Sequence, residues 1–263
     1  MKKTKVLLGC LGWILLFIVV QLFLYIGMTY FFQKEAYLEY KYKYPNVQIE
    51  ENDYINAYLN AEEYPSDLYV YMEKHAYVTL FVNLLLFLPF LIYFYPQKGK
   101  WKAKSKISFI KSSILGVSLA FFLNIIIDCF FPTPIVPISF WVLLSTGIVG
   151  PLLEEFLFRG ILYEKCKRVF SKKTTFCLVT LAFACIHTGI TILYALFMGM
   201  LFLYLREKGD HLKPAIYAHI VSNFFVPLCT PYLFTLSMPL KIALLLFCLF
   251  TFLYFLLPKK QNI

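Results

Sequence analysis

Residues 138–168 read ISFWVLLSTGIVGPLLEEFLFRGILYEKCKR, an apolar run that contains charged side chains near its end and leads into a basic cluster. A charge at the centre of a bilayer costs about 2.5–3.5 kcal/mol on insertion scales. Glu154, Glu155 and Arg159 together therefore oppose insertion by up to about 9 kcal/mol, against roughly 6 kcal/mol from the large apolar residues of the same run. The segment can span a membrane only if its polar face turns away from lipid, toward other helices or a wet cavity.

The composition of the whole chain indicates an integral membrane protein. Of the 263 residues, 60% are hydrophobic and 15% are charged, whereas soluble domains contain about 45–50% and 25%. A soluble fold of this size has too small an interior for 28 Phe side chains and the accompanying Leu and Ile, so the surplus must face lipid. Soluble nucleic-acid binders, secreted disulfide scaffolds and disordered chains are therefore excluded.

The hydrophobic runs predict an all-α fold of about eight transmembrane helices. The run 174–205 counts as two helices, because a single helix of this length would measure about 48 Å against a hydrocarbon core of about 30 Å. Thr188-Gly189-Ile-Thr191 supplies the turn between the two. The other runs cover residues 6–32, 76–95, a third that ends at 131, a fourth that begins near 138, 214–233 and 239–257.

The basic residues predict the orientation of these spans. They gather at the N-terminus and in alternate loops, which the positive-inside rule assigns to the cytoplasm together with the C-terminus of this cell-membrane protein. The acidic, Tyr-rich loop 33–75 is then extracytoplasmic. The formal charge of +10 thus reflects topology and contact with the lipid bilayer, and we expect no nucleic-acid partner. We divide the chain into an N-terminal part, 1–105, and a core of six spans, 106–258.

Helix geometry separates the charged residues of the fourth span. Glu155 and Arg159 are four positions apart and lie on one face, in the favourable order for an ion pair. Glu154 lies about 100° around the helix and has no such partner. We therefore expect Arg159 to neutralise and orient Glu155, and Glu154 to remain available for chemistry.

Two other spans carry polar side chains at similar depth. His187 lies on the fifth span with Phe183 one turn earlier, and His219 and Asn223 share one face of the seventh. We expect these faces and that of the fourth span to enclose a polar cavity that opens to the cytoplasm.

A carboxylate, two imidazoles and an amide without an evident nucleophile indicate activation of water. Glu154 can act as general base, His187 can share the water, and His219 and Asn223 can donate hydrogen bonds to a developing oxyanion. The same Glu154, His187 and His219 could instead hold a divalent metal such as zinc, for which carboxylate and imidazole are ordinary ligands. The spacing alone does not separate these alternatives.

Three short motifs, in order on three hydrophobic runs, resemble those of the CPBP family, which includes CAAX prenyl endopeptidases and Abi-type intramembrane proteases linked with bacteriocin self-immunity: Glu154-Glu155-x-x-x-Arg159, Phe183-x-x-x-His187 and His219-x-x-x-Asn223. The resemblance implies an eight-helix intramembrane endopeptidase in which the first glutamate and the first histidine activate water. It implies that the second histidine and the asparagine stabilise the oxyanion, and that Glu155 and Arg159 support the site. The family has been called metalloprotease, but a metal-free mechanism that depends on glutamate also fits its motif residues, and we favour the latter.

Three functions are consistent with these observations. The leading hypothesis is an endopeptidase that hydrolyses a bond of a membrane-associated or lipidated peptide or protein. The alternatives are a non-catalytic bacteriocin-immunity or regulatory membrane protein, and a proton-coupled transporter that uses the intramembrane carboxylates. The sequence contains no HExxH motif of a zinc protease and no GxSG motif of a serine protease of the rhomboid type.

Overall fold

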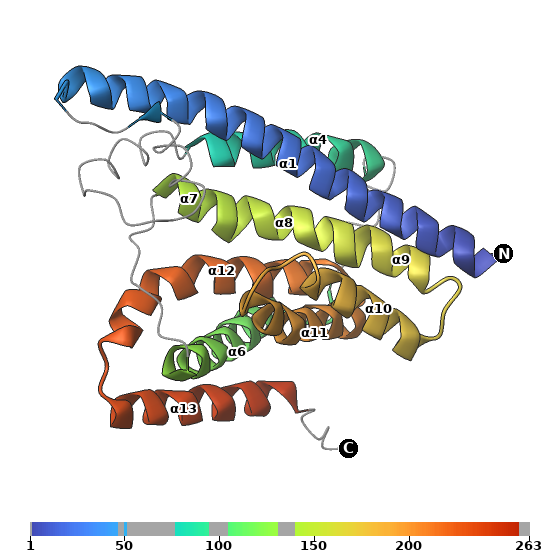
Figure 1. Cartoon of the computed structure of the whole chain (residues 1–263). Helices are drawn as coiled ribbons and strands as arrows, with labels where there is room; N and C mark the ends of the chain where they lie inside the picture. Colours follow the sequence, from blue (N-terminus) through green and yellow to red (C-terminus); the bar gives the residue numbers. More distant parts are fainter. Residues whose placement is uncertain (1, 47–49, 52–76, 95–104, 131–139, 258–263) are drawn as a thin grey trace, which may run out of the picture.

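The computed structural model describes residues 2–46, 50–51, 77–94, 105–130 and 140–257. Within these ranges the regular structure is helical and contains no strand, which confirms the all-α prediction (Figure 1). Most of the predicted extracytoplasmic loop lies outside the described residues, as do most of the first basic loop after it and the proline-rich link before residue 140.

Helix α1 (Lys2–Lys43) is longer than its hydrophobic run predicts. Its 42 residues measure about 63 Å at the usual helical rise. The helix continues eleven residues beyond the apolar run, into the segment predicted to be the extracytoplasmic loop, whose side of the membrane stays a prediction. Residues 33–43 contain good helix formers and neither Gly nor Pro, and the helix ends just before Pro45, a residue that disfavours helical backbone ahead of it.

The N-terminal helices pack side by side. Helix α4 (Tyr77–Phe94) lies along α1, and the Trp13 ring of α1 contacts Phe90 and Tyr93 of α4 at 6.2 and 5.5 Å between ring centroids. These contacts join the first two predicted spans along their apolar faces.

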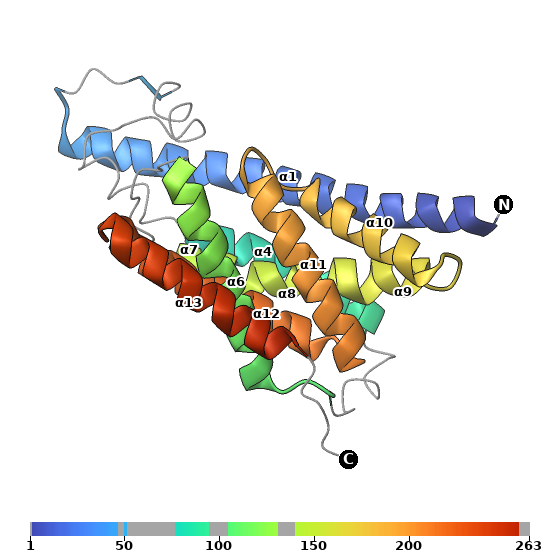
Figure 2. The ribbon, with the colours of Figure 1, turned by 90° about the horizontal axis from the view of Figure 1, so that it is seen from below.

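Helix α6 (Phe109–Phe130) lies between α12 (Lys213–Phe234) and α13 (Met238–Leu256). The approach of α6 to α12 is so close that a β-carbon at Gly116 would lie 2.5 Å from the carbonyl oxygen of Ala218. Figures 1 and 2 show α1 and α13 on opposite sides of the bundle, where their apolar faces are left uncovered by protein.

The fourth run forms one continuous rod with two π-helical turns. It passes through α7 (Phe140–Leu144), the π-turn η2 (Ser145–Val149), α8 (Gly150–Glu155), the π-turn η3 (Phe156–Leu162) and α9 (Tyr163–Cys166). Such π-bulges occur mostly as single turns inside α-helices and frequently at functional sites. The two turns lie immediately before and after the segment that carries both glutamates.

The predicted break within residues 174–205 is confirmed. Helix α10 (Lys172–Ala184) and helix α11 (Thr191–Gly209) are separate, and Gly189 in their connection has φ of +56°, a conformation that glycine adopts readily. Ser171 caps the start of α10 by accepting a hydrogen bond from the Thr174 N–H.

Four helical segments in the described part of the chain are long and apolar enough to cross a membrane. The apolar part of α4, Leu80–Phe94, is shorter, and α10 has only 13 residues. The protein is thus a helical membrane protein with four candidate spans, whereas the count of eight and the orientation remain predictions. The four segments are Lys2–Phe23, Phe109–Phe130, Phe140–Cys166 and Met238–Leu256.

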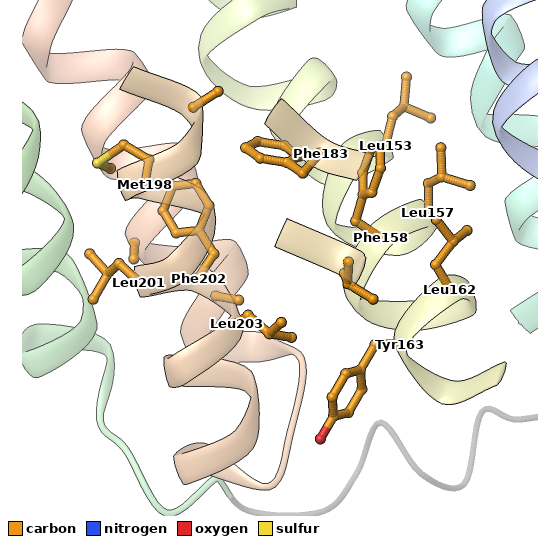
Figure 3. Close-up of a cluster of buried hydrophobic side chains, with 14 of the residues drawn as sticks. Leu153, Leu157, Phe158, Leu162, Tyr163, Phe183, Met198, Leu201, Phe202 and Leu203 are labelled. Atoms are coloured by element: carbon orange, nitrogen blue, oxygen red, sulfur yellow. The ribbon is translucent and has the colours of Figure 1, made fainter. Parts of the chain in front are cut away.

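A buried apolar cluster joins the fourth run to α10 and α11 (Figure 3). Leu153 and Phe158 extend from the rod, Phe183 from α10, and Met198 and Phe202 from α11, and each is at most 1% exposed. Because interiors are close-packed, this cluster fixes the three elements relative to one another. The polar residues of these elements are held at its edge.

Candidate functional site

Glu155 and Arg159 form a completely buried ion pair. The Arg159 Nη1 donates to Glu155 Oε1 at 2.9 Å, which confirms the pairing expected from their spacing. The Arg159 Nη2 donates to the carbonyl oxygen of Gly199 at 3.0 Å, and the guanidinium carbon lies 4.2 and 5.3 Å from the ring centroids of Phe183 and Phe202. A buried charge is tolerated when it is paired and hydrogen-bonded, and this guanidinium also has two aromatic faces beside it.

His219 lies between the two glutamates. Its Nδ1 is 2.9 Å from Glu155 Oε1, and its Nε2 is 3.7 Å from Glu154 Oε2. Because Glu155 already accepts from Arg159, we assign the hydrogen to Nδ1 of His219, which then donates to the carboxylate and leaves Nε2 on the side of Glu154. The Phe202 ring stacks on the imidazole at 4.2 Å with an interplanar angle of 22° and fixes its plane.

The two neighbouring glutamates have different surroundings. The Glu155 side chain is 0% exposed, whereas that of Glu154 is 23% exposed. Of the Glu155 oxygens, Oε1 serves both Arg159 and His219, and Oε2 has no hydrogen-bond partner among the described residues. Glu155 is therefore sealed into the protein, while Glu154 remains accessible beside His219.

The sequence predicted His187 on the helix of the fifth span. In the structure His187 lies just beyond the end of α10. The helix ends at Ala184, because the chain turns toward Gly189 there. The His187 Nδ1 is 2.9 Å from the Phe183 carbonyl oxygen, so this nitrogen donates and Nε2 remains as acceptor. The Phe183 ring connects His187 to the other site residues, with centroids 5.0 Å from the His187 ring and 6.0 Å from the His219 ring.

Asn223 lies one turn after His219 on α12 and faces η2. Its Nδ2 is 3.5 Å from the carbonyl oxygen of Thr146. The two elements are in close contact at Gly147, where a β-carbon would lie 3.2 Å from Phe224 Cα and 3.3 Å from Asn223 O. The predicted residues are thus distributed over one region, with four of them in direct contact and His187 and Asn223 at its sides.

The metal alternative stays a prediction. In the part of the chain that the structure describes, no three His, Cys, Asp or Glu side chains gather closely enough to hold a metal ion. The chemistry below is derived from what the residues themselves can do. The predicted cavity toward the cytoplasm stays a prediction.

Sequence reasoning missed the contribution of α11 to the site. Gly199 supplies the carbonyl that binds Arg159, and its lack of a side chain admits Phe183, since a β-carbon there would lie 2.9 Å from the Phe183 Cδ1. Phe202, one turn later, stacks on His219. In the sequence both residues resemble ordinary apolar span residues, and no motif marks them.

Comparison with known families finds a match over the region of the site. Residues 136–225 match the model of the family described as type II CAAX prenyl endopeptidase Rce1-like. We refer to these matched residues as the Rce1-like domain. The Rce1-like domain contains the rod, α10, α11 and the part of α12 that carries His219 and Asn223, and so includes every predicted site residue. The match confirms the resemblance that the three motifs indicated. The Rce1-like family is a family of proteases. No curated protein and no solved structure matches the chain.

Proposed function

We propose that the protein is an intramembrane endopeptidase that hydrolyses a peptide bond of a membrane-associated or lipidated peptide or protein, with water activated by Glu154 and His187. The protease family of the Rce1-like domain supports a hydrolase. The observation that carries the assignment is the contrast between Glu155, which is sealed and bonded to Arg159, and Glu154, which is accessible and lies 3.7 Å from His219 Nε2.

The first step is attack by water on the scissile carbonyl. Glu154 takes one proton from the water, while Nε2 of His187 accepts a hydrogen bond from the hydrogen that stays on the water oxygen. The water oxygen forms a bond to the carbonyl carbon, and the electron pair of the C=O double bond moves onto the carbonyl oxygen. His187 serves in this role because its Nδ1 hydrogen is held by the Phe183 carbonyl.

The second step is collapse of the tetrahedral intermediate. His219 and Asn223 lie one turn apart on one helix and donate to the oxyanion through Nε2 and Nδ2, which requires His219 to be doubly protonated. Glu155 balances the charge of that imidazolium through its contact with Nδ1. The C–N bond then breaks, and Glu154 returns its proton to the departing amine. Removal of one oxyanion donor typically costs about 10²–10³ in kcat.

The decisive experiment uses the purified full-length protein in liposomes of phosphatidylethanolamine and phosphatidylglycerol. A library of lipidated and membrane-inserted peptides is added, and the products are identified by mass spectrometry. Glu154→Gln should lower the cleavage rate by about 10²–10⁴-fold, the usual contribution of a general base. Glu164→Gln is the matched control, because Glu164 lies on the same rod but pairs with Lys167 and Arg206.

Retention of cleavage by Glu154→Gln, or the absence of any cleaved peptide with the wild type, would overturn the proposal. A transporter is favoured if the wild type cleaves no peptide but shows proton-driven uptake in the same liposomes, and if Glu154→Gln abolishes that uptake. A wild type and a Glu154→Gln variant that protect cells from a toxic peptide equally well favour a non-catalytic immunity protein.

A further inference from the structure

The register of the π-turn η2 and the position of Pro151 together bear on the backbone carbonyl of Thr146. In a π-turn a carbonyl accepts from the N–H five residues later, and the Gly150 N–H accordingly donates to the oxygen of Ser145. The next nitrogen in this register belongs to Pro151, which carries no hydrogen. In the π-helical register, the Thr146 carbonyl oxygen therefore has no main-chain N–H to accept from.

The neighbours of this carbonyl hold it in place without satisfying it. The Thr146 hydroxyl donates to the Val142 carbonyl at 2.8 Å, and Asn83 of α4 anchors the same turn by donating to Ser145 Oγ at 2.6 Å. In the described ranges, the side chain that reaches the Thr146 carbonyl oxygen is Asn223, and its Nδ2 remains 3.5 Å away. This distance is longer than that of a normal N–H···O bond.

Thr146 O and Asn223 Nδ2 thus form an acceptor and a donor side by side. Thr146 is exposed and Asn223 is half-buried, so both groups can be reached. A residue in extended conformation presents its own N–H and C=O to the same side, which is how two residues of antiparallel strands exchange both bonds. An acceptor and a donor 3.5 Å apart match these two groups of one extended residue.

We propose that Thr146 O accepts the main-chain N–H of the substrate residue whose carbonyl is hydrolysed, while Asn223 Nδ2 donates to the carbonyl of the same residue. This subsite rests on the proposed endopeptidase function. Its ligand is an extended peptide segment, recognised through its backbone, and Pro151 is the residue that keeps the acceptor free. A helical substrate segment does not fit, because its N–H groups are bonded within the helix. The substrate is therefore unwound at the cleaved bond.

The test uses the full-length protein in the same liposomes and the peptide found in the library, made in two forms. One form is all-amide, and in the other an ester oxygen replaces the N–H of the residue just before the cleaved bond. Loss of this hydrogen bond should lower kcat/KM of the wild type for cleavage at the original bond about tenfold. Pro151→Ala supplies an N–H that draws Thr146 O into the helix. This variant should cleave the all-amide peptide about tenfold more slowly and distinguish the two forms less than about twofold.

Pro89→Ala is the matched control, because Pro89 also removes an N–H inside a helix, in α4. It should keep the full discrimination between the two peptides. A wild type that cleaves both forms equally, or a folded Pro151→Ala variant that discriminates as the wild type does, overturns the subsite and leaves the endopeptidase function intact. If Pro151→Ala does not fold, the wild-type comparison decides. Failure of the wild type to cleave the all-amide peptide overturns the endopeptidase function instead.

Discussion

At the scale of single residues, Glu154 and Glu155 are chemically identical neighbours with different surroundings. Helix geometry directs one carboxylate into the packed interior, toward Arg159, and the other toward an accessible edge. The interior carboxylate then bonds His219, and its charge favours the orientation in which His219 Nε2 faces Glu154. The two proposed roles, support for Glu155 and chemistry for Glu154, thus fall on adjacent residues of the chain.

We predict that Glu155→Gln destabilises the protein far more than Glu154→Gln does. The amide introduced at position 155 would keep the shape of the side chain but leave the buried Arg159 without its counter-charge, a loss of about 3–5 kcal/mol for a broken buried pair. Glu154→Gln should change stability by less than about 0.5 kcal/mol, as is usual where no such feature is disturbed. Unfolding of the purified protein in detergent, followed by circular dichroism, measures both. Equal losses in the two variants would show that the ion pair does not hold this region together.

At the scale of elements, the approach of helices is set by glycines whose neighbours are backbone atoms. Gly116 brings α6 against α12, and Gly147 brings η2 against the same helix next to Asn223. Both sides of the candidate site therefore depend on the position of α12, which carries His219 as well. The π-turn at η2 adds a second effect, because its register and Pro151 together release the Thr146 carbonyl.

We predict that Gly116→Ala destabilises the fold, since the new β-carbon would lie 2.5 Å from a backbone oxygen of α12 and the helices would have to separate. Overpacking of this kind costs about 1–3 kcal/mol. Gly12→Ala in α1 is the matched control, because a β-carbon there meets nothing within 4 Å, and it should stabilise the helix by about 0.5–1 kcal/mol. The thermal midpoints of both variants in detergent decide, and a Gly116→Ala midpoint at or above that of the wild type contradicts the prediction.

At the scale of the whole molecule, the two helices whose apolar faces are least covered by other helices, α1 and α13, lie on the outside of the bundle. Helices α1 and α13 lie on opposite sides and expose apolar faces, while the Rce1-like domain forms the packed interior between them (Figures 1 and 2). Four segments have the length and composition of a span, and the predicted orientation follows from where the basic residues lie.

The orientation gives a prediction at this scale. After replacement of the native cysteines by alanine, Lys167→Cys at the end of the rod should react with a membrane-impermeant maleimide only from the cytoplasmic side. Thr235→Cys, between α12 and α13, should react only from the opposite side, because three predicted spans, the fifth, sixth and seventh, lie between the two positions. Both side chains are exposed. Labelling of intact cells and of inverted vesicles distinguishes the sides, and reaction of both positions from one side would contradict the predicted topology.

The sequence by itself determined the features that depend on composition and on near neighbours along the chain. The surplus of apolar residues requires contact with lipid, and the turn at Gly189 separates α10 from α11. Glu155 pairs with Arg159 because residues four positions apart lie on the same face of a helix. The same kind of reasoning did not locate the ends of α1 and α10, because it took helix ends from hydrophobicity. Good helix formers continue α1 beyond its apolar run, and α10 ends before His187.

Only the tertiary structure decided which distant groups meet. His219 is 64 positions from Glu155, and the stacking of Phe202, the carbonyl of Gly199 and the pairing of Asn223 with Thr146 likewise join separate elements. Contacts across helices depend on their crossing and rotation, which small differences in packing at glycine and aromatic side chains control. A sequence pattern with a local period does not encode the crossing and rotation of helices. The candidate residues could therefore be proposed from the sequence, whereas their partners on other elements could not.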